Sequence, residues 1–415
     1  MLINLIGKEL KQQLKNISIY LLAAIILLFY FTQFAPPSGD ASLEPVLDPQ
    51  RQNQYFGSIE ITDPVEEMRA IYMHMYMDYL TGIILKQGFM LNRDVKLNEK
   101  QLQSIDSTMD AIYPEGISQF SREELLSMSE GKQKPGIDFE GFTPAIGYEE
   151  YKELLKKLDK ELGGNTYYSE KNIDALKRRP MTYAEAVEEF EKLKEKDKLT
   201  GAYGRVFADY MGVVAGFFPI FIAAFLLTRD RRSNMYELIY SRRVSSLSYV
   251  FSKYVALLIT TLVLFLIPAT HATYSFAQVA AVKGYTIDVM AFYKYTIVWI
   301  LPTLMFTIAS GMLSSIVFGN GIVSIVIQFI LWVFSMLPLV GDYGLGKMVI
   351  RFNELGLYDS YMKWLPSITV NRIFYMCMSL LLTGAAAWVL SRKRGAVNGA
   401  SRFSPLRLLQ RKAAA

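Results

Sequence analysis

The 415-residue chain has very few of the side chains that most often carry catalysis or bind metal ions. It contains one cysteine, Cys377, and two histidines. A single thiol excludes a disulfide framework and the zinc sites that need several thiolates. Two histidines argue against a histidine-based catalytic or metal cluster. We therefore expect a non-catalytic chain without a cofactor or metal of its own.

Charge is unevenly distributed along the sequence. Residues 36–204 contain 31 acidic and 21 basic residues, a net charge of −10, whereas the other 246 residues contain 8 acidic and 23 basic ones, a net charge of +15. The basic residues lie beside long apolar runs, as the positive-inside rule predicts for cytoplasmic flanks, and not in a pattern typical of nucleic-acid binding. The distribution predicts a membrane protein with one large acidic extracellular domain and no nucleic-acid partner.

Six apolar runs approach the roughly 20 residues that cross a bilayer. A removed signal peptide is the alternative for the first run, but the run is long for that purpose and Gln33-Phe34-Ala35 is a poor cleavage site. We expect an all-α polytopic membrane protein with six transmembrane helices. The runs are Ile17–Phe34, Val206–Thr228, Tyr254–Thr273, Tyr295–Phe318, Ile322–Val340 and Ile373–Leu390.

The positions of the basic residues orient these spans in the cell membrane with both termini in the cytoplasm. Ile6, Leu10, Leu14 and Ile17 alternate with lysines and predict an amphipathic interfacial helix; an inward extension of the first span is the alternative. The expected organisation is this helix (1–16), the first span (17–35), the extracellular domain (36–204), the second span (205–228), a cytoplasmic loop (229–253), spans three to six (254–390) and a basic cytoplasmic tail (391–415).

The extracellular domain is expected to be mostly helical. Met68–Met90 and Tyr148–Leu162 have amphipathic patterns, and the second ends at two glycines. Ser121 with Glu124, and Thr182 with Glu185, have the spacing of capping boxes that begin two further helices.

Ionisable groups are scarce within the spans, where Asp209, His271, Lys294 and Arg372 all fall near the ends of the apolar runs. Ion-coupled transporters and intramembrane enzymes generally need acidic or histidine side chains inside the membrane, so both classes are disfavoured. Gly341–Lys347 has the spacing of a phosphate-binding loop, but Met348 follows where a hydroxyl should hold magnesium, so we expect an ordinary loop.

Small and hydroxyl-bearing residues recur along two spans. They predict either close helix packing or a substrate path lined by hydroxyl groups. The residues are Gly212 and Gly216 in the second span and Thr303, Thr307, Ser310 and Ser314 in the fourth.

The loop after the second span contains the most specific pattern, Glu237-Leu238-Ile239-Tyr240-Ser241-Arg242-Arg243-Val244-Ser245, with Lys253 at the start of the third span. Together with the six-span layout and the short Gly319-Asn320-Gly321 link, this pattern resembles type-2 permease subunits of ATP-binding-cassette (ABC) exporters. Arg242 stands where that family usually has proline, and Asn234 where it often has glycine.

The resemblance implies a permease that exports a substrate with two copies of a separate cytoplasmic ABC ATPase, which binds ATP and magnesium. It also implies a second permease protomer, either identical or a paralogue, within the membrane lipid. The alternative is a receptor or assembly protein that displays the extracellular domain and transports nothing. The spans contain no charge that selects the substrate class. The residues expected to couple to the ATPase are Glu237, Leu238, Ser241, Arg242, Arg243, Lys8 and Lys11.

Overall fold

A computed structural model describes residues 2–37, 41, 43–47, 54–86, 93–130, 139, 141–170, 172–227, 244–337, 343–352 and 355–402. The chain divides into two compact units. Unit 1 contains Met1–Glu44 and Glu189–Ala415, and unit 2 contains Pro45–Glu188.

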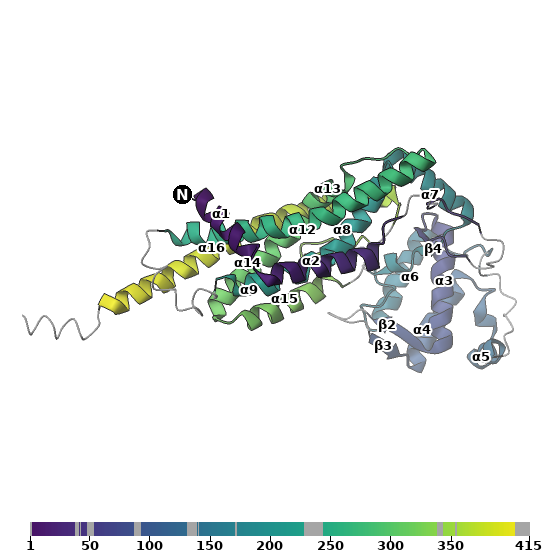
Figure 1. The fold of residues 1–415 in the computed structure, drawn as a ribbon. Coiled ribbons are helices and arrows are strands. Elements are labelled where there is room, and N and C mark those ends of the chain that lie inside the picture. The colour runs from purple at the N-terminus through teal and green to yellow at the C-terminus, as the bar shows by residue number, and fades with distance from the viewer. Residues whose placement is uncertain are drawn as a thin grey trace, which may run out of the picture. The chain divides into compact units, whose positions relative to one another are not determined.

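Unit 1 is helical throughout its regular structure (Figure 1). Its central helix, α14 (Leu301–Phe318), packs against α8, α9, α12, α15 and α16. The other elements are α1 (Leu2–Gln13), α2 (Ile17–Phe29), the π-helical turn η1 (Tyr30–Phe34), α8 (Thr200–Phe217), α9 (Ile220–Leu226), α12 (Ser246–Lys283), α13 (Ala291–Tyr295), the π-helical turn η4 (Thr296–Ile300), α15 (Gly321–Ser335) and α16 (Tyr358–Arg402). The helix α7 (Tyr183–Lys196) contains the boundary between the two units.

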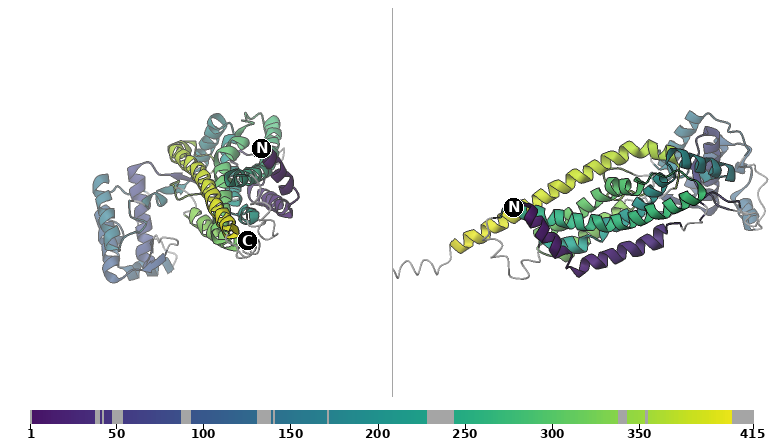
Figure 2. Two further views of the ribbon diagram at one scale, coloured as in Figure 1. Left: turned by 90° about the vertical axis from the view of Figure 1, so that its left-hand side faces the viewer. Right: turned by 45° about the horizontal axis from the view of Figure 1, so that its top comes forward.

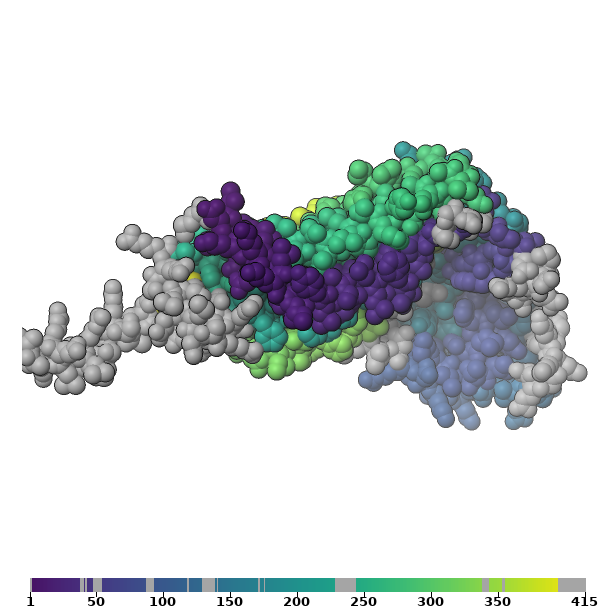
Figure 3. All heavy atoms as spheres, in the orientation of Figure 1, coloured from purple at the N-terminus to yellow at the C-terminus, as the bar shows by residue number. Residues whose placement is uncertain are grey.

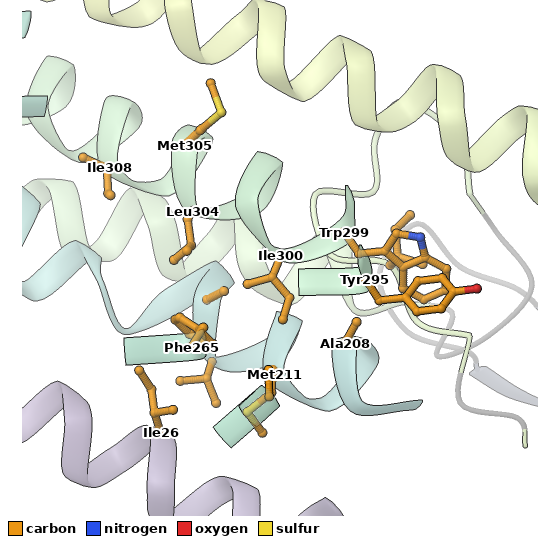
Figure 4. Close-up of a cluster of buried hydrophobic side chains, with 14 of the residues drawn as sticks. Ile26, Ala208, Met211, Phe265, Tyr295, Trp299, Ile300, Leu304, Met305 and Ile308 are labelled. Carbon is orange, nitrogen blue, oxygen red and sulfur yellow. The ribbon is translucent and has the colours of Figure 1, made fainter. Parts of the chain in front are cut away.

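The core of unit 1 is apolar and aromatic. Ile26 of α2, Phe265 of α12 and Leu304 of α14 point toward one another from three helices (Figure 4). Tyr295 and Trp299 extend the same cluster, with their ring centroids 5.4 Å apart in an edge-to-face arrangement. These contacts fix the helices that position the polar groups described below.

Five stretches of the described chain are long and apolar enough to span a membrane, namely Ile17–Phe34, Thr200–Leu226, Ser246–Lys283, Ala291–Phe318 and Tyr358–Arg394. The predicted fifth span falls on α15, which has only 15 residues. At 1.5 Å per residue α15 is about 22 Å long, shorter than a hydrocarbon core of about 30 Å. Residues 338–340 of the predicted run lie outside the described residues.

Two helices run well past the apolar runs that predicted them. The third run was expected to end near Thr273, but α12 continues to Lys283 and ends at Gly284, which has a φ of 74°. The sixth run was expected to begin at Ile373, but α16 begins at Tyr358 and has 45 residues (Figure 2). Hydropathy marks only the part of a helix that meets lipid, so it misses polar helical extensions. Each helix contains one internal proline, Pro268 or Pro366.

The tight link and the separate first helix that the sequence predicts are both present in unit 1, whereas the interfacial position of that helix stays a prediction. The link between α14 and α15 is a tight turn in which Gly319 has a φ of 68° and the Asn320 side chain accepts from the Ile322 amide at 2.9 Å. A break at Leu14–Asn16 separates α1 from α2, and the Asn16 side chain caps α2. Figure 3 shows α1, α2 and α12 exposed side by side on one face of unit 1.

Unit 2 is mostly helical, but it also contains two small antiparallel sheets that the sequence analysis did not predict. β1 (Ser58–Glu60) pairs with β4 (Arg178–Pro180), and β2 (Ile83–Lys86) pairs with β3 (Arg93–Lys96). The helical segments are α3 (Pro64–Thr81), α4 (Glu99–Ile112), η2 (Ile117–Gln119), α5 (Arg122–Glu130), α6 (Tyr148–Glu161) and η3 (Ile173–Ala175).

The helix predicted over Met68–Met90 is wrong from Gly82 to Lys86, and residues 87–90 lie outside the described residues. It ends at Thr81, because Gly82 adopts a left-handed φ of 67° that stops the helix, and β2 follows. Both capping boxes are confirmed, since the Ser121 and Thr182 side chains accept from the amides of Glu124 and Glu185. The amphipathic helix that stops at two glycines is confirmed as α6.

Asp78 is expected to make the stability of unit 2 depend on pH. The Tyr168 hydroxyl donates to its carboxylate at 2.6 Å, but burial raises the Asp78 pKa to about 6. Because the folded state holds this proton more tightly than the unfolded state, the stabilisation is complete below the unfolded pKa of 3.8 and is lost as pH rises through about 6. Asp78→Asn cannot ionise and keeps an acceptor for Tyr168.

This substitution should stabilise unit 2 by about 1–2 kcal/mol at pH 7.5 and by much less near pH 4. Thermal unfolding of the full chain in detergent at both pH values measures the difference, and the exposed Asp94→Asn serves as the control. An equal gain from Asp78→Asn at both pH values would contradict the assignment.

Candidate transport and coupling sites

The predicted hydroxyl and glycine residues come together on the faces of α8 and α14. The Thr307 hydroxyl donates to the Gly216 carbonyl at 3.3 Å, and the Thr303 hydroxyl donates to the Met348 carbonyl at 2.9 Å. A Cβ on Gly216 would lie 2.7 Å from a methyl group of Val349, so only glycine fits there. Ser314 donates only within its own helix, to the Ser310 carbonyl at 2.6 Å.

Gln328 of α15 completes this polar cluster, and the sequence analysis missed it. Its side-chain amide donates to the Gly216 carbonyl at 2.7 Å, and its carbonyl accepts from the Ser310 hydroxyl at 2.7 Å. Gln328 is buried although α15 is otherwise almost entirely apolar. The sequence could have indicated this residue, because a single side-chain amide in an apolar helix needs a buried hydrogen-bond partner.

Residues 343–352 follow α15 without regular helix or strand and reach the polar cluster; Gly344–Gly346 are exposed, whereas Lys347–Ile350 are buried. Met348, Val349 and Phe352 are all buried. Irregular backbone at membrane depth is tolerated only where protein or water satisfies its polar groups. Here the Val349 backbone amide donates to the Ser335 hydroxyl at 2.6 Å, and the Asn371 side-chain amide donates to the Lys347 carbonyl at 2.9 Å.

Arg372 of α16 holds the same segment through its whole guanidinium group. It donates to the carbonyls of Trp299 (3.0 Å) and Met348 (2.9 Å) and to the Thr303 hydroxyl (2.9 Å). It also donates to the Lys347 carbonyl at 3.2 Å and to the Asn371 side chain. Arginine has five N–H donors in a planar fork, and each of its three nitrogens has an acceptor here. The residue therefore joins η4, α14, α16 and the 343–352 segment.

Two ion pairs lie at the end of the 343–352 segment: Arg351 belongs to it, and the Arg205 guanidinium lies 5.7 Å from the centre of the Phe352 ring. Arg351 pairs with the fully buried Asp209 of α8 at 2.7 Å. Arg205 pairs with Asp197 through its two terminal nitrogens, each 2.7 Å from a carboxylate oxygen. Its guanidinium lies 4.2 Å from the centre of the Tyr361 ring. The sequence analysis did not single out Arg205, because the predicted apolar run begins one residue later.

At the other end of unit 1, α1 is joined to the start of α12. Lys253, which the sequence analysis placed at the start of the third span, pairs with Glu9 of α1 at 3.2 Å, and its side chain is only 4% exposed. Lys8 and Lys11 are exposed on α1. Arg394 of α16 donates to the Val244 carbonyl at 2.9 Å, just before α12. This end of the molecule therefore brings α1, α12 and α16 together.

The remaining predicted coupling residues, Glu237, Leu238, Ser241, Arg242 and Arg243, lie outside the described residues. The same holds for Gly341 and Asp342 of the string that resembles a phosphate-binding loop. In the described part of that string, the Lys347 side chain donates to the Leu337 carbonyl. No group of three or more His, Cys, Asp or Glu residues that could hold a metal ion occurs among the residues described.

Comparison with known proteins gives one match. The sequence model of a family described as "ABC-2 family transporter protein" matches residues 79–392, about three quarters of the chain, including the loop after α9 and the 343–352 segment. No curated protein and no solved structure matches the chain.

Proposed function

The chain belongs to the ABC-2 transporter family and is a multi-pass membrane permease of an ABC transporter, and from this premise we propose that it exports its substrate with a separate cytoplasmic ATPase. The family match carries the proposal, because it covers most of the membrane-spanning helices together with the loop after α9. The family implies an ABC ATPase partner and a dimeric arrangement of permeases. We propose two ATPase copies and a second permease protomer.

The coupling path in this proposal begins at the loop that contains Glu237, Arg242 and Arg243. ATP-driven closure of the ATPase pair pushes on this loop and on the exposed lysines of α1. The ion pair between Lys253 and Glu9 supports a joint movement of α1 and α12, since charged hydrogen bonds in a poorly solvated site fix relative position. Lys253 thus links α1 to the helix that follows the predicted coupling loop.

For the hydroxyl stripe of α14 we propose close packing and not a substrate path. Thr303, Thr307 and Ser310 each donate to a group within the same chain, and Gly216 leaves no room for a Cβ. Small residues with hydroxyl groups allow such close approach of helices in lipid. The substrate path then lies on other faces of the permease dimer.

Purification tests the function most directly. The affinity-tagged permease, co-expressed in turn with each ABC ATPase of its own genome that lacks membrane spans, should retain one of them through size-exclusion chromatography, and the complex should hydrolyse ATP in proteoliposomes faster than that ATPase does alone. A permease that never retains an ABC ATPase would instead support the receptor or assembly alternative.

Unit 2 is proposed to lie outside the cell, because its sequence is acidic and the basic residues flank the spans on the other side. In a Cys377→Ser background, Ser107→Cys and Ser127→Cys place thiols at exposed positions of unit 2, and Gln12→Cys places one on α1. An impermeant maleimide should label the first two in intact cells and the third only after lysis. The reverse pattern would overturn the topology.

A further inference from the structure

A groove with a volume of about 380 Å³ lies between the start of α1, the start of α12 and the second half of α16. Its lining is almost entirely apolar and includes Leu2, Leu247, Phe251, Leu380 and Gly384. The volume falls in the range of about 300–1,000 Å³ that is typical of ligand sites. The groove therefore suits a slender hydrocarbon group.

The groove opens on the exposed apolar face of α16. Leu247 and Leu380 on its two sides are 58% and 53% exposed, and a Cβ on Gly384 would meet no atom within 4 Å. Ile373 and Met376 continue the same exposed strip of α16 away from the groove. The groove is thus a recess in an exposed apolar surface of unit 1.

Basic and aromatic side chains lie beside one end of this recess. Trp388 and Arg392 follow Gly384 along the exposed strip of α16, and the guanidinium of Arg392 lies 5.2 Å from the centre of the Trp388 ring. Eight residues of helix separate Gly384 from Arg392, which is about 12 Å. Trp and basic residues in this arrangement mark the headgroup level of a membrane.

An acyl chain gains little from leaving bulk lipid for an apolar groove, because both surroundings are apolar. Retention of a lipid in this groove therefore needs an electrostatic contribution at its headgroup. Arg392, with the exposed Lys8 and Lys11 of the neighbouring α1, supplies positive charge at this end of the unit. A basic residue near the surface attracts an anionic headgroup by about 1 kcal/mol, or about fivefold in affinity.

We propose that this groove is a binding site for an anionic phospholipid of the cytoplasmic leaflet, with one acyl chain against Gly384 and Leu247 and the phosphate beside Arg392. The leaflet rests on the proposed topology, whereas lipid binding itself does not depend on transport. A lipid in this place would pack against α1 and α12, the two helices joined by the pair of Lys253 and Glu9.

The test uses the full-length permease in phosphatidylcholine nanodiscs that contain a few per cent of phosphatidylglycerol with a photoreactive diazirine on its acyl chain. After illumination, mass spectrometry should find the label concentrated on peptides that contain Leu247–Phe251 and Leu380–Gly384. Gly384→Trp and Leu247→Trp fill the groove from opposite sides and should each reduce this labelling about fivefold. Ile373→Trp, on the same strip but outside the groove, should leave it unchanged.

Arg392→Gln should lower labelling by phosphatidylglycerol about fivefold, toward the level given by a phosphatidylcholine probe. Melting temperatures measured beside the labelling show that each variant is folded. Equal labelling of groove and non-groove surfaces, or no loss with either tryptophan variant, overturns the site. Equal labelling of the wild type by both probes overturns the anionic specificity. If the wild-type permease shows the expected labelling but retains no ABC ATPase during purification, the proposed function is contradicted and the lipid site is still supported.

Discussion

Arg372→Leu is expected to prevent the permease from folding stably. The substitution removes all five donors that satisfy the carbonyls of Trp299, Lys347 and Met348 and two side-chain acceptors. The Met348 and Lys347 carbonyls keep the Thr303 hydroxyl and the Asn371 side-chain amide as donors. A hydrogen bond to a charged donor contributes about 1.5–3 kcal/mol, so losing the bonds of Arg372 to Trp299, Thr303 and Asn371 should still cost about 3–5 kcal/mol. Fluorescence-detected size-exclusion chromatography after heating should show aggregated or absent protein.

Arg372→Lys separates the geometry of this site from its charge, and Lys363→Leu is the control. Lysine keeps the charge but not the planar fork, so it should recover only a small part of the stability. Lys363 is exposed on the same helix, and its replacement by leucine should change the melting temperature little. A stable Arg372→Leu variant would show that the 343–352 segment is held by its apolar contacts alone.

Glu237→Lys is expected to uncouple the permease from its ATPase while the permease stays folded. We propose that Glu237 accepts a hydrogen bond from a basic residue of the ATPase, so reversal of its charge would replace an attraction by a repulsion. Truncating one member of an interfacial charge pair costs about 2–5 kcal/mol, which is at least tenfold in affinity. Retention of the ATPase and stimulation of its activity in proteoliposomes should both fall by at least that factor.

Glu237→Gln should give an intermediate loss, because it removes the charge without introducing repulsion. Glu123→Lys reverses an exposed charge of unit 2 and should leave ATPase retention unchanged. Normal yield and melting temperature must accompany the loss in Glu237→Lys. Unchanged retention and stimulation of the ATPase by that variant would remove Glu237 from the coupling contacts.

The sequence predicted the membrane helices because lipid leaves a strong signal in hydropathy. Ile17–Phe34 is recovered with the same bounds, and the resemblance to ABC exporter permeases is confirmed at the level of the ABC-2 family. The extensions of α12 to Lys283 and of α16 back to Tyr358 were missed, since helices outside the hydrocarbon core need no apolar run. The small strands of unit 2 were missed because each has only three or four residues.

The polar contacts of the candidate sites could not be predicted in the same way. Arg372 was visible as a charge near a span, but its acceptors are backbone carbonyls that can belong to any residue. The 343–352 segment is rich in glycine and reads as a surface loop, yet Val349 and Phe352 are buried. Which segment fills the space between helices depends on packing partners distant in sequence, and hydropathy contains no information about them.

The lengths of α12 and α16 have a mechanical consequence. With 38 and 45 residues, they are rods of about 57 and 68 Å, and a tilt of about 5° around the middle of α16 moves each end by about 3 Å. Pro268 and Pro366 each remove one backbone hydrogen bond, so bending stiffness is lowest there. In the proposed coupling, the part of α12 from Ser246 to Pro268 would move as a stiff unit from the Glu9 contact and bend at the proline.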